Sequence, residues 1–135
     1  MASWSCNMED NEKIKQILVD RALTSEEQTL TRWIIEHGVQ DANEFLDQLD
    51  RARVCELCFC GCTSINFKIG GMPNPGGGLG ILGDFIFGEN DTRCGIFVFE
   101  QGGVLAGLEV YGLAGDAPDF LPNKSDLRNF YGSEL

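Results

Sequence analysis

Histidine, basic side chains and long apolar runs are all scarce in this 135-residue chain. It has one histidine, and its 10 lysine and arginine residues are outnumbered by 21 acidic residues, which gives a net charge of −11. A surface of that sign repels phosphate backbones, so we expect no direct binding of nucleic acid. No stretch of about 18 apolar residues is present, so we expect no membrane-spanning helix and no membrane partner.

The N-terminal segment MASWSCNMEDNEKIK lacks the basic head and apolar core of a secretory signal. We therefore expect a cytoplasmic protein, in a reducing compartment that disfavours structural disulfides. The length and the 43% content of hydrophobic residues suit a single domain that spans residues 1–135. Within it we expect a loose N-terminus at residues 1–8, helices over residues 10–53, an antiparallel sheet over residues 54–112 and a tail over residues 113–135.

The first expected helix runs from Asp10 to Ala22. Its apolar residues Ile14, Ile17 and Leu18 recur at the spacing of one helix face. This spacing predicts an amphipathic helix that packs on the core through those three side chains.

Two more helices are predicted from their start signals. Thr24 can cap a helix while Glu27, three residues later, reaches back to the backbone of the cap. Asp41 and Glu44 repeat this spacing before a third apolar stripe. The N-terminal part of the chain therefore predicts three helices.

After Val54 the apolar pattern changes to a period of two, with Ile65, Phe67 and Ile69 alternating with polar residues. Three more apolar segments, joined by short turns, follow as strands: ILGDFIF, CGIFVFE and VLAGLEVYGL. Strands joined by such turns pair in antiparallel fashion. The sequence therefore predicts an α+β fold, in which three N-terminal helices pack on one face of a roughly four-stranded antiparallel sheet.

Four cysteines crowd the short segment CELCFCGC. One interpretation is a zinc site whose ligands are Cys55, Cys58, Cys60 and Cys62, or in which Cys94 takes the fourth position. Side chains two residues apart on a flat strand lie about 6.6 Å apart, so the segment would have to curl around the ion. The other interpretation is that these cysteines are small, soft packing residues and that the protein has no cofactor.

Catalytic interpretations find less support in the sequence. His37, the single histidine, lies beside Gly38 at a helix end, where a histidine commonly interacts with the helix dipole. Asp84 and Glu109 could act as paired carboxylates in acid–base chemistry, but their positions also suit the solvent face of a sheet. We therefore expect a binding protein and not an enzyme.

Asp84, Glu109 and Tyr111 interrupt otherwise apolar strands. A sheet face that mixes acids, an aromatic and aliphatics is typical of a protein-docking surface, and an acidic exterior steers basic partners toward it. We therefore predict a protein-binding module, in the manner of an immunity or antitoxin protein that captures a basic toxin. The expected contacts are these three residues and the glycine-rich loop GGMPNPGGGLG, and the alternative function is cysteine-based zinc binding.

Four segments carry a resemblance to known sequences: LTSEEQTLTRWIIEHG, ANEFLDQLDRARV, CFCGCTSINF and GVLAGLEVYGLAGDAPDFLP. They resemble a group of small bacterial proteins of unknown role, which share a W-[LI]-[LI]-x-H-G helix end, a C-x-C-G-C-x-S run and an L-E-V-Y-G-L-A-G segment. The similarity covers residues 24–122. Cys58, Cys60 and Cys62 fit the motif, whereas Cys55 and Cys94 lie outside it. The resemblance implies a bacterial, cytoplasmic protein and implies no activity.

Overall fold

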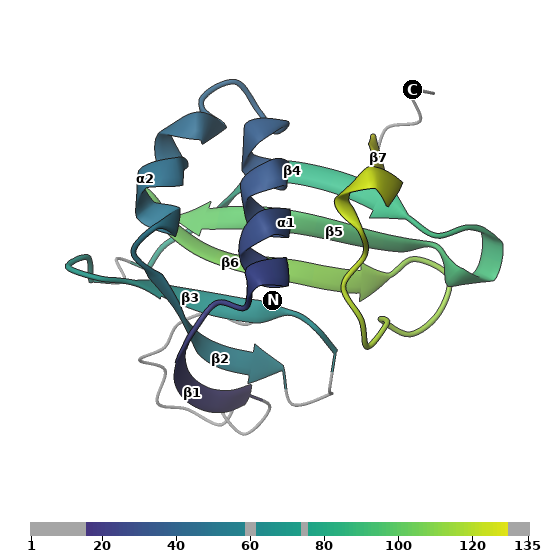
Figure 1. Cartoon of the computed structure of the whole chain (residues 1–135), viewed down its shortest axis with the longest axis horizontal. Helices are drawn as coiled ribbons and strands as arrows, with labels where there is room; N and C mark the ends of the chain where they lie inside the picture. The colour runs from purple at the N-terminus through teal and green to yellow at the C-terminus, as the bar shows by residue number, and fades with distance from the viewer. Residues whose placement is uncertain (1–15, 59–61, 74–75, 130–135) are drawn as a thin grey trace.

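One antiparallel sheet organises the molecule. The computed structural model describes residues 16–58, 62–73 and 76–129, and in them the strand order is β1-β2-β3-β6-β5-β4-β7 (Figure 1). The strands are β1 (Gln16–Ala22), β2 (Ala52–Cys58), β3 (Ile65–Ile69), β4 (Leu79–Phe87), β5 (Cys94–Gln101), β6 (Val104–Gly112) and β7 (Arg128–Asn129). The helices are α1 (Ser25–Glu36) and α2 (Leu46–Leu49), with short 3₁₀ helices η2 (Ala42–Phe45), η3 (Asn90–Thr92) and η4 (Lys124–Asp126).

The hydrophobic core lies between α1 and one face of this sheet, here called the helix face (Figure 1). Leu30, Ile34 and Ile35 of α1 are buried in this layer. Trp33 of the same helix meets Phe85 of β4 edge-on, with ring centroids 5.1 Å apart. Each apolar side chain of this size stabilises the fold by about 1.5–3 kcal/mol when it leaves water.

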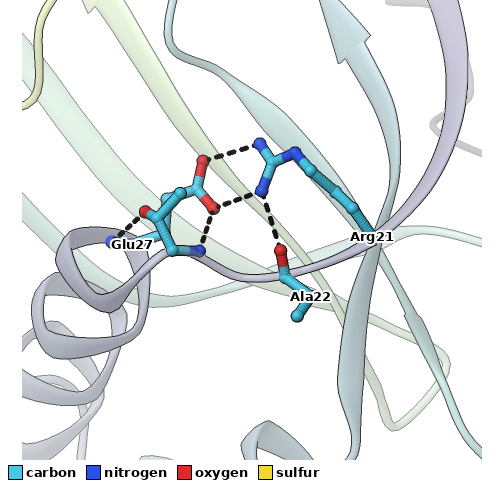
Figure 2. Close-up of polar contacts among 4 residues, drawn as sticks. Arg21, Ala22 and Glu27 are labelled. Carbon is cyan, nitrogen blue, oxygen red and sulfur yellow. Dashed lines mark hydrogen bonds and ion pairs between the residues drawn. The ribbon is translucent and has the colours of Figure 1, made fainter.

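The start of α1 is fixed by the capping box that the sequence predicts (Figure 2). The Glu27 backbone donates to Thr24 Oγ1 at 3.0 Å, and the Thr24 backbone donates to Glu27 Oε1 at 2.9 Å. Arg21 of β1 donates to both carboxylate oxygens of Glu27, at 2.9 and 3.0 Å, and to the carbonyl of Ala22. The guanidinium joins β1 to the first turn of α1 and supplies the positive charge that the buried Glu27 carboxylate requires.

The predicted fold class is wrong, because the molecule is mainly a seven-stranded sheet with two short α-helices. The largest difference is the segment expected to be a helix from Asp10 to Ala22. Its described part, residues 16–22, is strand β1, which pairs with β2; residues 10–15 lie outside the described residues. Ile17 and Leu18 are 43% and 57% exposed on this outermost strand, so their helical spacing reflects no buried helix face.

The prediction of a third long helix, starting after Asp41, is also wrong. Asp41 makes no capping hydrogen bond, and the chain passes through η2 into the single turn of α2. It then enters β2 at Ala52, which is already paired with Ile69 of β3. Pairing with a distant strand therefore ends the helical segment before the predicted boundary at residue 53.

The predicted antiparallel strands β3 to β6 are present, and β5 lies between β6 and β4 as its apolar character on both faces suggests. The neighbours β3 and β6 are paired only through Ile65 with Leu108 and Asn66 with Gly107. We call this short ladder the junction, because it joins the strands that precede the glycine-rich loop to those that follow it. None of the described helices has the length and apolar character needed to cross a membrane.

Candidate functional site

The face of the sheet opposite α1, here called the outer face, brings the predicted acids into one row. Asp84 of β4 lies opposite Phe97 of β5, which lies opposite Glu109 of β6. The next row of the same face contains Ile86, Gly95 and Tyr111. Two strand spacings separate the acids, so their Cα atoms are about 10 Å apart, with one aromatic ring between them.

Aromatic side chains form a strip along this face. A Cβ atom at Gly95 would overlap the Tyr111 ring, so that ring lies across the glycine. The same ring meets Phe97 edge-on with centroids 5.9 Å apart, and Phe97 lies 5.7 Å from Phe99. The strip gives both neighbouring carboxyl groups, those of Asp84 and Glu109, an apolar environment.

Both carboxyl groups are half-buried, and no described residue donates a hydrogen bond or forms an ion pair with either. Burial raises the pKa of Glu109 from its usual 4.5 to about 7. Burial also raises the pKa of Asp84 above its usual 3.8. Loss of solvation is the cause in both cases, because no positive charge nearby offsets it.

Further oxygen atoms of the outer face have no donor. The buried Asn66 Oδ1 and Gln101 Oε1 lack a hydrogen-bond partner, as does Asp84 Oδ1. The amide orientations follow from their other contacts, since Asn66 Nδ2 donates to Glu56 Oε1 and Gln101 Nε2 donates to the carbonyl of Gly77, both at 2.7 Å. The unsatisfied atoms of this face are therefore acceptors.

Both amide acceptors lie on one side of the row of the two acids, the side of Phe99. Asn66 pairs with Gly107, which is the next residue of the outer face along β6 from Glu109. Gln101 occupies the next position of this face beyond Phe99 on β5. The row of the two acids, with the unsatisfied acceptors beside it, suits a ligand that brings donors and positive charge.

Sequence reasoning placed Asp84, Glu109 and Tyr111 on one face, and the structure places them there. The sequence analysis did not identify Phe97 as the residue between the two acids, nor Gly95 as the residue over which the Tyr111 ring lies. Glycine inside a strand often marks the close approach of another group, so Gly95 and Gly107 are the signals that could have indicated the aromatic strip.

The described cysteines lie on β2, on β5 and between β2 and β3. Cys55, buried on β2, takes part in a disulfide bond, unlike the reduced thiol expected from the sequence, so its sulfur is not a thiolate ligand. Two strands separate Cys94 on β5 from Cys58 on β2, which puts their Cα atoms about 14 Å apart or more. Within the described ranges no three His, Cys, Asp or Glu side chains could hold a metal ion, and Cys60 lies outside those ranges. The zinc interpretation stays a prediction.

The remaining candidate residues have local roles. His37 ends α1, stacks on Trp33 with ring centroids 4.0 Å apart, and its Nδ1 lies 2.9 Å from the Trp33 carbonyl. Cys58 and Cys62 are half-buried and line a cavity of about 600 Å³ beside Phe120.

No family model matches this chain, and no curated protein or solved structure was found to be similar to it. The resemblance to small bacterial proteins stays a prediction. The outer face is therefore the observation from which a function can be argued.

Proposed function

We propose that this protein is a small anionic binding module that captures a basic protein partner on its outer face. One form of this role is that of an immunity or antitoxin protein, which covers the active site of a cationic toxin. The observation that carries the proposal is the pair Asp84 and Glu109, two half-buried carboxyl groups to which no described residue donates.

Ionising these half-buried carboxyl groups costs free energy that a bound cation can offset. The rise of the Glu109 pKa from 4.5 to about 7 corresponds to a penalty of at most ~3 kcal/mol for the ionised form. A partner cation placed beside Glu109 would offset that penalty, and the net charge of −11 would speed the encounter through long-range attraction.

The test is capture from an extract of the source organism. The baits are the wild-type protein, the variant D84N/E109Q, and the control E36Q/E44Q, which removes the same charge from exposed residues away from the outer face. We expect a basic protein to be enriched at least tenfold on the wild type and the control and lost on D84N/E109Q.

The captured protein is then purified, and its association rate is measured between 50 and 500 mM NaCl. A rate that falls at least tenfold supports electrostatic capture. An acidic partner, an association rate independent of salt, or equal capture by D84N/E109Q would contradict the proposal.

A further inference from the structure

The described side-chain atoms of the outer face that lack a hydrogen-bond partner are acceptors, and this restricts the group that can bind there. Asp84 Oδ1, Asn66 Oδ1 and Gln101 Oε1 are all acceptors without a partner. Asn66 and Gln101 are 2% and 3% exposed, so water satisfies neither of them fully. A guanidinium group offers five N–H donors and no acceptor, whereas an ammonium group offers three donors around a single atom.

The distance between the two acids also favours a guanidinium group over an ammonium group. Asp84 and Glu109 stand on the same face, on either side of Phe97, with Cα atoms about 10 Å apart. A guanidinium that donates from two of its nitrogens spans roughly 8 Å between its acceptors, whereas an ammonium spans roughly 5 Å. The wider group is the one that can reach both carboxylates.

The ring between the acids suits a planar cation. Phe97 is half-buried and is braced by Tyr111 and Phe99 at centroid distances of 5.9 and 5.7 Å. Guanidinium groups stack on aromatic faces and give up their hydration more readily than ammonium groups do. Phe97 therefore offers a stacking surface for a guanidinium.

No described cation of this chain fills that role. Arg128 of β7 is the nearest, since it lies opposite Ile86 in the row next to Asp84, but its guanidinium donates to the carbonyl of Gly88 at 2.8 Å. Lys68 and Arg93 are each two same-face positions from the row of Phe97, about 13 Å along the strands. Arg53, and to a smaller extent Lys68, lower the pKa of Asp20, so Lys68 lies near that carboxylate. Arg53, which lies opposite Lys68 on this face, forms an ion pair with Asp20. Glu56 is a further acid of this face, and its Oε1 accepts a hydrogen bond from Asn66.

We infer that the outer face binds the guanidinium group of an arginine side chain, held between Asp84 and Glu109 against Phe97. This inference rests on the proposed function, because it names the anchor by which a basic partner would be held. A lysine would satisfy one carboxylate and leave the other without a donor.

The test uses small probes, so it does not need the partner. Binding of N-acetyl-arginine amide to the ¹⁵N-labelled full chain is followed by NMR, with the lysine analogue and the neutral citrulline analogue as comparisons. We expect the arginine probe to bind at least fivefold more tightly than the lysine probe, with shifts centred on Phe97 and Glu109, and the citrulline probe not to bind.

Two variants and a pH series test whether both acids take part in binding the probe. D84N and E109Q should each weaken arginine binding at least fivefold, whereas E36Q should not change it. Wild-type binding should be about eight- to tenfold weaker at pH 6 than at pH 8, because Glu109 must lose its proton, and E109Q should show a smaller dependence.

Equal binding of the lysine and arginine probes, shifts away from Phe97, or unchanged affinity in E109Q would overturn the inference. If a basic protein is captured through Asp84 and Glu109 while the arginine probe fails to bind, the inference fails and the proposed function stands. If the arginine probe binds there while no basic protein is captured, the inference stands and the proposed function fails.

Discussion

The environment of Glu109 makes the stability of the folded protein depend on pH. Its pKa is about 7 in the folded protein and 4.5 when it is solvated. Between these values the folded protein holds a proton that the unfolded chain has released. The unfolding free energy therefore falls as the pH rises from 4.5 to 7, and the full loss of at most ~3 kcal/mol is reached above pH 7.

Replacing Glu109 with glutamine should remove this loss. We expect E109Q to be about 1–3 kcal/mol more stable than the wild type at pH 8 and nearly equal to it at pH 4.5, because glutamine resembles the protonated acid. Urea denaturation at both pH values measures this. E36Q, at an exposed position, serves as the control, and an equal effect of E109Q at both pH values would be incompatible with the raised pKa.

For single residues, the sequence predicts that strand side chains alternate between the two faces of the sheet, but it does not predict where a bulge interrupts that alternation. Asp84 lies on the outer face, as strand periodicity indicates, and strict alternation would place Leu82 beside it. A bulge between Ile81 and Gly83 instead turns Leu82 into the core, where it is 5% exposed. No local pattern marks that extra residue, so this part of the outer face could not be derived from the sequence.

Among the elements, α1 was predictable because its signals are local. Thr24 and Glu27 lie three residues apart and satisfy each other without any help from the rest of the fold. β1 was not predictable in this way, because Arg21 and its neighbours become a strand through pairing with β2, more than thirty residues away along the chain. Tertiary pairing overrides local periodicity in segments of this kind.

The contact between α1 and β4 leaves no room for a larger residue at Gly83. A Cβ atom there would lie 2.6 Å from both Ile34 Cγ2 and the Ile34 carbonyl oxygen. We expect G83A to lower the unfolding free energy by about 1–3 kcal/mol, because α1 must move away from the sheet. G78A is the matched control, since nothing lies within 4 Å of the Cβ position there. Equal stability of G83A and G78A in denaturant titrations would show that α1 is packed less closely than described.

For the whole molecule, the charge of −11 makes self-repulsion a factor in stability. Three ion pairs join described residues, Arg21–Glu27, Arg32–Asp50 and Arg53–Asp20, and two of them are largely exposed. Exposed pairs of this kind add little stability and leave most of the acidic charge uncompensated.

Added salt should therefore stabilise the protein. We expect Tm to rise by about 3–5 °C between 20 and 500 mM NaCl, which corresponds to ~1 kcal/mol for a domain of this size, because screening weakens the repulsion. Differential scanning calorimetry measures the rise, and KCl should give the same result if screening is its cause. A lower Tm at high salt would mean that attractive pairs dominate.

The junction has a consequence for how the polypeptide can be divided. The strands before the glycine-rich loop, β1 to β3, pair among themselves, as do those after it, and the two sets meet through Ile65 with Leu108 and Asn66 with Gly107. α1, from the first set, packs on β4 and β5 of the second. A protease nick at the exposed Gly78 would therefore break no strand pairing, and the two fragments would remain associated as a non-covalent complex.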